Sequence, residues 1–292
     1  MPYSTTAVQV PRGPVTSEII FYKPPADGSA PFNYTYSPPP DGYPQRNFGE
    51  DVHKVHLADI RGHEKEYSLD RDAFVALQGV STATTHATFD SDDEVRRIYY
   101  PEVESLLLER VPGKPYRVII FDHTIRRPKS EREPVHRAHV DQTARAAAER
   151  VRLHVPEQEE KEKLLAGAGK EDGEEGASRY RIINVWKPLN GAVVSSPLGL
   201  AQASSVDQKR DLVPVEHRYR HRTGETMGVR YNEAQHWLYW SGMEDDERLL
   251  LQCSDTRPSV VGRVPHTAWT DPRTPDGAKG RESIEVRALV LG

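Results

Sequence analysis

A histidine and an aspartate two positions apart, His139 and Asp141, are candidate metal ligands. On a β-strand, side chains two positions apart point to the same side, so both could reach one ion. A second histidine, His266, lies about 125 positions beyond Asp141 and would complete a set of two imidazoles and one carboxylate. This set holds iron(II) in non-haem oxygenases and leaves three metal positions free for other ligands.

The His-x-Asp pattern alone does not identify a metal site. The chain has 12 histidines, so such a match arises about once by chance. The alternative for His266 is a structural histidine that packs beside Trp269. A jelly roll favours the metal site, because its topology places strands that are far apart in the sequence next to each other.

The C-terminal segment supplies a candidate anion site. Arg281 and Ser283 stand two positions apart, where a predicted strand over residues 283–291 begins. A guanidinium pairs with a carboxylate and a hydroxyl adds a hydrogen bond, so the two residues suit a dicarboxylate. Positions 281, 283, 285 and 287 share one face of the strand, opposite an apolar face. Arg287 is the rival anion anchor on that face, and a solvated surface charge is the alternative for Arg281.

Seven short segments of the chain match, in order, blocks of one protein family. They are residues 139–143, 183–189, 196–200, 210–213, 237–240, 265–269 and 283–287. From about residue 50 to its end, the chain resembles the fungal gibberellin-desaturase and aspergillic-acid-hydroxylase-like family. It is also similar to the cephamycin-pathway proteins once labelled methyltransferases. The combination of segments is specific, although each segment alone is not.

The resemblance implies an oxygenase with a double-stranded β-helix, or jelly roll, that uses iron(II), 2-oxoglutarate and O2. It implies iron-ligand roles for His139, Asp141 and His266, and 2-oxoglutarate binding by Arg281 with help from Ser283. The expected reaction begins with abstraction of a hydrogen atom from a small specialised metabolite or an amino-acid-derived compound. Hydroxylation, desaturation and ring closure all stay open as outcomes.

One departure from the family pattern concerns the expected substrate pocket. Asn184 and Trp186 share a strand face and are predicted to line the pocket. The family has an arginine after the Asn-x-Trp motif, where this chain has Lys187. Lysine keeps the charge but lacks the planar two-pronged donor of arginine, which puts a substrate-carboxylate contact there in doubt. The alternative is a buried tryptophan with a hydrogen-bonded asparagine that stabilises the sandwich.

The elements that must position these residues are mostly short strands. Turn residues separate strand-like segments, which indicates a mainly β sandwich or barrel with flanking helices. Strands are predicted at residues 117–122, 180–186, 229–231, 235–240, 248–252 and 283–291. Helices are predicted at residues 143–154 and 91–110, the second divided by Pro101. We expect a single domain over residues 1–292, with an extended Pro-rich N-terminal arm (1–50) and a flexible charged loop (157–178).

Composition narrows the class of protein. The formal charge of −5, without a basic block, argues against nucleic acid as a partner. The single cysteine, Cys253, excludes an internal disulfide and favours a reducing, cytoplasmic setting. Apolar runs are too short to cross a bilayer. Glycine-rich nucleotide loops are absent from the sequence, which excludes Rossmann and P-loop enzymes. A small-molecule substrate fits best, and a homodimer is possible.

Two other classes stay open. One is a cupin-like iron dioxygenase that needs no 2-oxoglutarate, for which a dispensable Arg281 would be the sign. The other is a non-catalytic jelly-roll binding protein, in which His139, Asp141 and His266 persist only as polar core residues.

Overall fold

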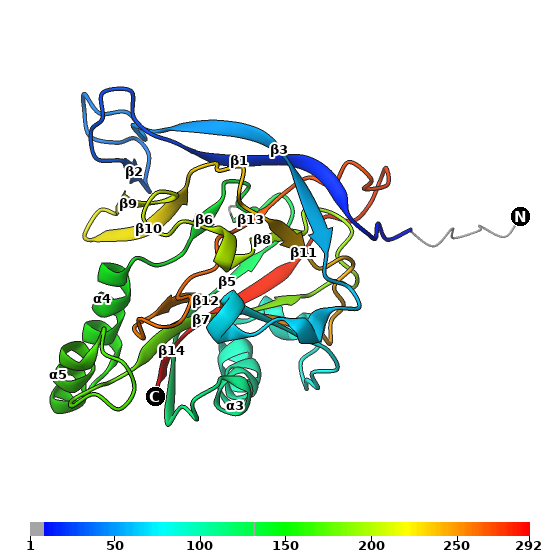
Figure 1. Ribbon diagram of the computed structural model, residues 1–292. Coiled ribbons are helices and arrows are strands. Elements are labelled where there is room, and N and C mark those ends of the chain that lie inside the picture. The colour runs from blue at the N-terminus through cyan, green and yellow to red at the C-terminus, as the bar shows by residue number, and fades with distance from the viewer. Residues whose placement is uncertain (1–8, 131) are drawn as a thin grey trace, which may run out of the picture.

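Two β-sheets form the body of the computed structural model, which describes residues 9–130 and 132–292. The major sheet has nine strands, in the spatial order β1 (Val15–Lys23), β3 (Gly49–Asp59), β11 (Trp237–Tyr239), β8 (Leu198–Ala201), β13 (His266–Ala268), β6 (His139–Val140), β10 (Thr223–Val229), β9 (Leu212–Arg218) and β2 (Phe32–Tyr34). The minor sheet has five strands, in the order β4 (Phe74–Leu77), β12 (Arg248–Asp255), β7 (Tyr180–Pro188), β14 (Ser283–Leu291) and β5 (Arg117–Arg126). Most neighbours in each sheet are distant in the sequence, as the jelly-roll prediction requires (Figure 1).

Apolar side chains from both sheets meet in the interior. Trp186 and Leu249 of the minor sheet pack with Leu200 and Leu238 of the major sheet in one buried cluster. The expected mainly β jelly roll is therefore confirmed. Cys253 is buried in β12 and packs in the apolar core.

The outer face of the minor sheet is covered by helix α3 (Tyr100–Arg110). Ile284 and Val286 of β14 pack against Val103 and Leu107 of this helix. Because side chains alternate along a strand, Ser283, Glu285 and Arg287 then face the interior, as the sequence predicted for this face.

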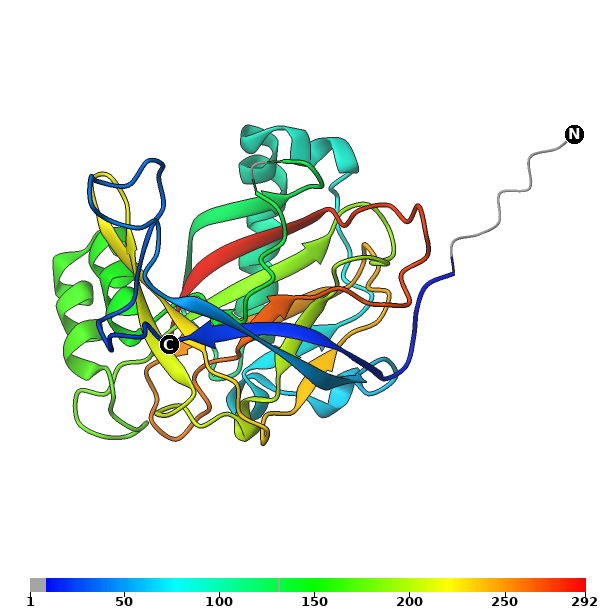
Figure 2. The same cartoon turned by 90° about the horizontal axis from the view of Figure 1, so that it is seen from above.

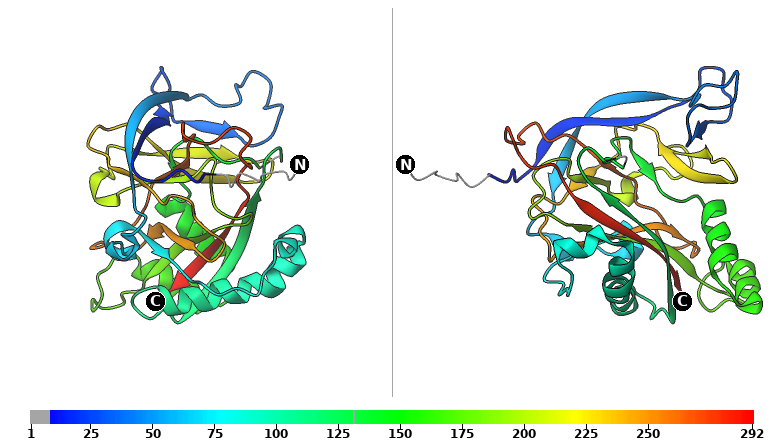
Figure 3. Two further views of the ribbon diagram at one scale, coloured as in Figure 1. Left: turned by 90° about the vertical axis from the view of Figure 1, so that its right-hand side faces the viewer. Right: turned by 180° about the vertical axis from the view of Figure 1, so that it is seen from behind.

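Helix α4 (Ala144–His154) starts shortly after Asp141. Its N-cap residue is Thr143, whose hydroxyl accepts a hydrogen bond from the backbone N–H of Ala146. It is followed by helix α5 (Gln158–Gly167). The remaining helical segments are short: η1 (Glu64–Glu66), α1 (Leu69–Asp72), η2 (His86–Asp90), α2 (Asp92–Glu94), the π-helical turn η3 (Val95–Tyr99) and η4 (Ala203–Ser205). Figure 3 shows α3 and the α4–α5 pair as two separate groups.

Three segments differ most clearly from the secondary structure that the sequence predicts. Helix α5 occupies the first half of the charged segment 157–178, where no helix was expected; Leu164 is buried, and Glu160 accepts a hydrogen bond from Arg117 at 2.7 Å. Pro101 does not divide a helix but lies in the first turn of α3, where its missing N–H is tolerated. The strand predicted at residues 229–231 ends at Val229 and begins earlier, at Thr223.

The N-terminal segment joins the major sheet. Strand β1 pairs with β3 along its whole length, and Figure 2 shows this pair crossing the top of the other strands. Strand β2 lies between β1 and β3 in the sequence, but it pairs in parallel with β9 at the far edge of the sheet. Residues 1–8 of the expected arm lie outside the described residues. None of the helices in the described part of the chain has the length and apolar character needed to cross a membrane.

Candidate metal centre

Two neighbouring strands of the major sheet bring the predicted triad together. His139 of β6 is the direct cross-strand partner of His266 of β13, and their ring centroids are 4.5 Å apart. Asp141 lies one residue beyond the end of β6. One nitrogen or oxygen of each of the three side chains lies within 4.8 Å of the others. The strand pairing therefore closes the long sequence separation between Asp141 and His266.

Backbone contacts fix which ring nitrogen each histidine presents. Nδ1 of His139 lies 2.8 Å from the carbonyl oxygen of Arg137, and Nδ1 of His266 lies 3.1 Å from that of Val264. A carbonyl oxygen only accepts, so each Nδ1 carries the proton and each Nε2 presents its lone pair. Burial, together with the charge of His139, lowers the pKa of His266 to about 4, which keeps this ring neutral. Imidazoles whose Nδ1 is held by a carbonyl oxygen in this way are suitable metal ligands.

The carboxylate of Asp141 has one oxygen toward the histidines and one toward the minor sheet. Its Oδ1 lies 3.3 Å from Nε2 of His139 and 4.0 Å from Nε2 of His266. Its Oδ2 accepts from Nδ2 of Asn184 at 2.7 Å and lies 3.9 Å from Nη1 of Arg287. Burial alone would raise the pKa of Asp141, but the two histidines and Arg287 hold it well below its usual range. The aspartate is therefore ionised and ready to bind a cation.

The inner face of β14 carries further charged groups. Arg287 donates to Oδ1 of Asp122 at 2.6 Å and to the hydroxyl of Thr124 at 3.0 Å, so its guanidinium is already paired. Its Nη1 also lies 3.6 Å from Oε1 of Glu285. Burial and the negative charge of Asp141 raise the pKa of Glu285.

Arg281 is a buried cation that has no carboxylate partner among the described residues. Its side chain lies over the ring of Trp186, with 5.3 Å between the guanidinium carbon and the ring centroid, and Nη1 donates to the carbonyl oxygen of Ser196. Among the described residues, its Nε has no hydrogen-bond partner. Burial and the nearby charge of Arg126 lower the pKa of Arg281 to about 9. Ser283, two residues further, is also buried.

Known proteins resemble this chain in both sequence and structure. A family profile described as "Oxidoreductase/YMDC permease-like domain" matches residues 19–291. The chain is 33% identical to the hydroxylase/desaturase poxK of Penicillium oxalicum, with 96% of this chain and 92% of that protein aligned. It is 30% identical to the alpha-ketoglutarate-dependent dioxygenase phiK of a fungal species, over the full length of both. The solved structure of the iron and alpha-ketoglutarate-dependent endoperoxidase NvfI superposes with a TM-score of 0.83 and 27% identity, covering 97% of this chain and 99% of NvfI.

The chain belongs to the fungal Fe(II)/2-oxoglutarate-dependent oxygenases. The family expected from the sequence is thus confirmed, as are its oxidoreductase class and its use of iron, 2-oxoglutarate and O2.

In this oxygenase the three residues expected in the substrate pocket do not lie together. Asn184 and Trp186 face the interior, where Asn184 contacts Asp141 and Trp186 packs in the core between the sheets. Lys187 lies on the opposite face of β7, where its Nζ is 5.7 Å from the ring centroid of Phe89 and donates to the carbonyl oxygen of Pro188. Strand alternation already separates position 187 from positions 184 and 186.

Sequence reasoning missed the contribution of β5 to the site of this oxygenase. Arg126, Thr124 and Asp122 are the cross-strand partners of Ser283, Glu285 and Arg287. The segment was identified as a strand, but only as far as residue 122, and its register against β14 has no local signal in the sequence. The pairing is what places a second arginine, Arg126, beside Arg281.

Proposed function

We propose that this protein oxidises a C–H bond of a small specialised metabolite, with iron(II) held by His139, Asp141 and His266. The observation that carries the proposal is the convergence of two imidazole nitrogens and one carboxylate oxygen within 4.8 Å. Two imidazoles and a carboxylate with open positions fit iron(II) in oxygenases. When bound, iron(II) with 2-oxoglutarate and O2 supplies the oxidising power to break an unactivated C–H bond.

Arg281 is the better anchor for the far carboxylate of 2-oxoglutarate. Arg287 is already paired with Asp122, whereas no carboxylate of the described residues lies within 4.0 Å of the Arg281 guanidinium. A buried cation without a counter-ion is costly, and a bound carboxylate removes that cost. Ser283 adds a hydroxyl on the same strand face, and Arg126 adds positive charge nearby.

The remaining task of the protein is to orient the substrate and exclude water. Trp186 offers an apolar wall beside Arg281 on the inner face of β7. We assign no pocket role to Lys187, because its side chain lies on the other face. The position in which the reacting C–H bond is held influences whether hydroxylation, desaturation or ring closure follows. The relatives poxK and NvfI carry the names hydroxylase/desaturase and endoperoxidase, so one scaffold supports several outcomes.

The test is an anaerobic titration of metal-free protein with iron(II) and then 2-oxoglutarate, followed by visible absorption. We expect a charge-transfer band that is absent in His139→Ala and weaker in Arg281→Ala. Iron binding without a band would indicate a cupin-like dioxygenase that does not use 2-oxoglutarate. Folded wild-type protein that binds no iron would overturn the proposal and leave a binding protein.

A further inference from the structure

The Asp141 oxygen that points away from the histidines is held by two residues of the minor sheet. Asn184 donates to this oxygen, Oδ2, at 2.7 Å, and Nη1 of Arg287 lies 3.9 Å from it. We propose that Asn184 and Arg287 form a clamp that positions Asp141 so that it offers only Oδ1 to the metal. This inference rests on the proposed metal triad and adds two positioning residues that act through Asp141.

The two clamp residues are neighbours by strand register. Asn184 of β7 and Arg287 of β14 are direct cross-strand partners, so their side chains project side by side from the minor sheet. Asp141 follows β6 of the major sheet. The clamp therefore spans the interior from one sheet to the other, and the buried position of Asn184 keeps water from competing for the same oxygen.

The orientation of each clamp residue follows from its contacts. A carboxylate can only accept hydrogen bonds, so the amide of Asn184 must present its nitrogen to Asp141. Arg287 is held at its other end by Asp122 at 2.6 Å and Thr124 at 3.0 Å. The hydrogen bond from Asn184 and the positive charge of Arg287 both act on Oδ2, which favours one rotation of the carboxylate.

The rotation of the carboxylate matters for the chemistry. A carboxylate can bind a metal through one oxygen or through two. With Oδ2 engaged, the free oxygen is Oδ1, the atom 3.3 Å from His139 and 4.0 Å from His266. One oxygen and two nitrogens leave three metal positions free, which a two-pronged keto acid and O2 together require. A carboxylate free to turn would occupy one of these positions with its second oxygen.

The clamp is tested by metal affinity, which needs no substrate. We expect Asn184→Ala to raise the Kd for Co(II), titrated into metal-free protein, by about 10- to 100-fold, the usual effect of losing a partner of a metal ligand. We also expect the visible Co(II) absorption band to change shape, because the number of coordinating oxygens changes. The matched control is Asn232→Ala, which removes an asparagine that donates to the buried Asp211 at 3.1 Å, a residue outside the metal site.

Arg287 gives an independent test of the same clamp. Arg287→Lys keeps the positive charge but loses the fork that bonds Asp122 and Thr124, whereas Arg287→Met loses both. We expect the Kd for Co(II) to rise in the order wild type, Arg287→Lys, Arg287→Met.

The outcomes separate this inference from the proposed function. Wild-type protein that binds no Co(II) or iron(II) would overturn the metal triad and the clamp with it. Wild-type binding with an unchanged Kd and spectrum in Asn184→Ala would overturn the clamp alone, even if the melting temperature falls as it does in Asn232→Ala. Should Asn184→Ala fail to fold, Asn184→Ser and the Arg287 series carry the same expectation.

Discussion

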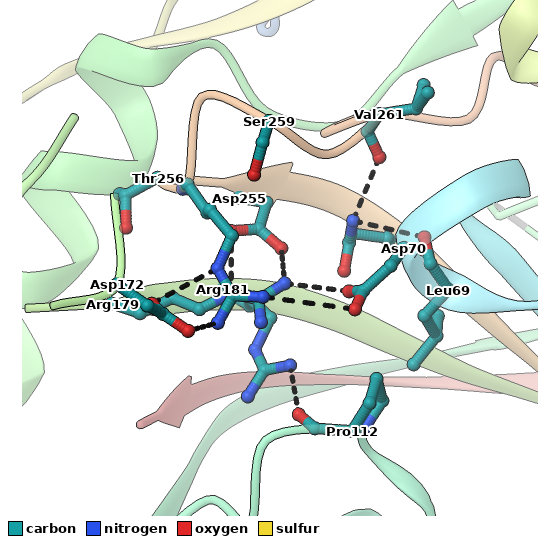
Figure 4. Close-up of polar contacts among 12 residues, drawn as sticks. Leu69, Asp70, Pro112, Asp172, Arg179, Arg181, Asp255, Thr256, Ser259 and Val261 are labelled. Atoms are coloured by element: carbon teal, nitrogen blue, oxygen red, sulfur yellow. Dashed lines mark hydrogen bonds and ion pairs between the residues drawn. The ribbon is translucent and has the colours of Figure 1, made fainter. Parts of the chain in front are cut away.

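Two buried groups of arginines and carboxylates lie at different ends of strand β7, and they are built differently. The first, which we call the strut, lies where β7 begins and β12 ends (Figure 4). In it, Arg179 donates to both oxygens of Asp255, at 3.0 and 2.6 Å, and to Asp70 of α1 at 2.8 Å. Arg181 donates to the carbonyl oxygens of Pro112 and Gly292, so the strut also ties down the end of the chain.

The metal site has similar residue types, but its charged groups are less completely paired than Asp255 of the strut. The side chain of Asp255 is fully buried and both of its oxygens are paired with Arg179. In the metal site, Arg281 has no carboxylate partner in the part of the chain that the structure describes, Glu285 has a raised pKa, and the imidazole Nε2 atoms face a carboxylate. The strut also contains Arg181, a buried guanidinium whose partners among the described residues are two carbonyl oxygens, but both oxygens of its buried carboxylate, Asp255, are paired. We therefore expect the Arg179–Asp255 pair to act on stability and Arg281 to act on ligand binding.

The largest expected effect breaks the strut. Arg179→Met leaves Asp255 buried without its counter-ion, which destabilises a protein by about 3–5 kcal/mol. Urea unfolding of metal-free protein measures the loss. We expect the Kd for Co(II) of the folded variant to equal that of wild type. A stable Arg179→Met variant with weakened metal binding would reverse the assigned roles of the two clusters.

The opposite result is expected for Arg281 in the metal site. Arg281→Met removes an uncompensated buried cation, so the stability of the metal-free protein should equal or exceed that of wild type. The affinity of the iron-loaded protein for 2-oxoglutarate should fall by about 10- to 100-fold, because a charged hydrogen bond is lost. Lys279→Met, at an exposed position nearby, is the control. Destabilisation without any change in 2-oxoglutarate affinity would assign Arg281 to the fold instead.

A lower pH should affect the stability of the metal-site side more than that of the strut, because only the metal-site side contains histidines among the groups discussed. Burial, with the charge of Arg137, lowers the pKa of His217 to about 4, and this residue lies near His139 and Asp141. A histidine whose pKa is lower in the folded chain takes up a proton on unfolding, so its contribution to stability is lost as the pH falls from about 6.5 to 4.

The corresponding measurement is the free energy of unfolding of metal-free protein at pH 7 and pH 5. We expect His217→Gln to remove about 1–2 kcal/mol of the decrease between these two pH values. His56→Gln, at an exposed position, should leave the decrease unchanged. An identical pH dependence in wild type and His217→Gln would show that His217 is not a buried neutral histidine.

The smallest effect is expected at the outer edge of the strut. Arg257 pairs with Asp172, whose side chain is 67% exposed. Exposed ion pairs contribute little, so Asp172→Asn should change the free energy of unfolding by less than about 1 kcal/mol. The same urea titration measures it. A loss as large as that of Arg179→Met would mean that the strut extends to the surface.

The sequence allowed the pairing of His139 with Asp141 on one side of a strand and the polar face of β14 to be predicted, because both depend on local spacing, whereas His266 was predicted from the jelly-roll topology and the family resemblance. His139, Asp141 and the alternation of residues 283–287 need only the two-residue period of a strand. The partners of these residues could not be predicted, because they depend on the register between distant strands. The contact of Asn184 with Asp141 and the strut around Arg179 are both of this kind. Helix α5 escaped prediction because its stabilising contacts come from β5 and from the core.

The cross-strand pairing of His139 with His266 also has a consequence for how the protein matures. The ribosome must synthesise the chain as far as His266 before both histidines are present. Strand β13 must then pair with β6. Contacts between such distant segments form slowly, because a long loop must first be closed. A partly synthesised or partly folded chain therefore lacks the complete triad. Binding of a metal ion by all three residues requires that β13 has already paired with β6.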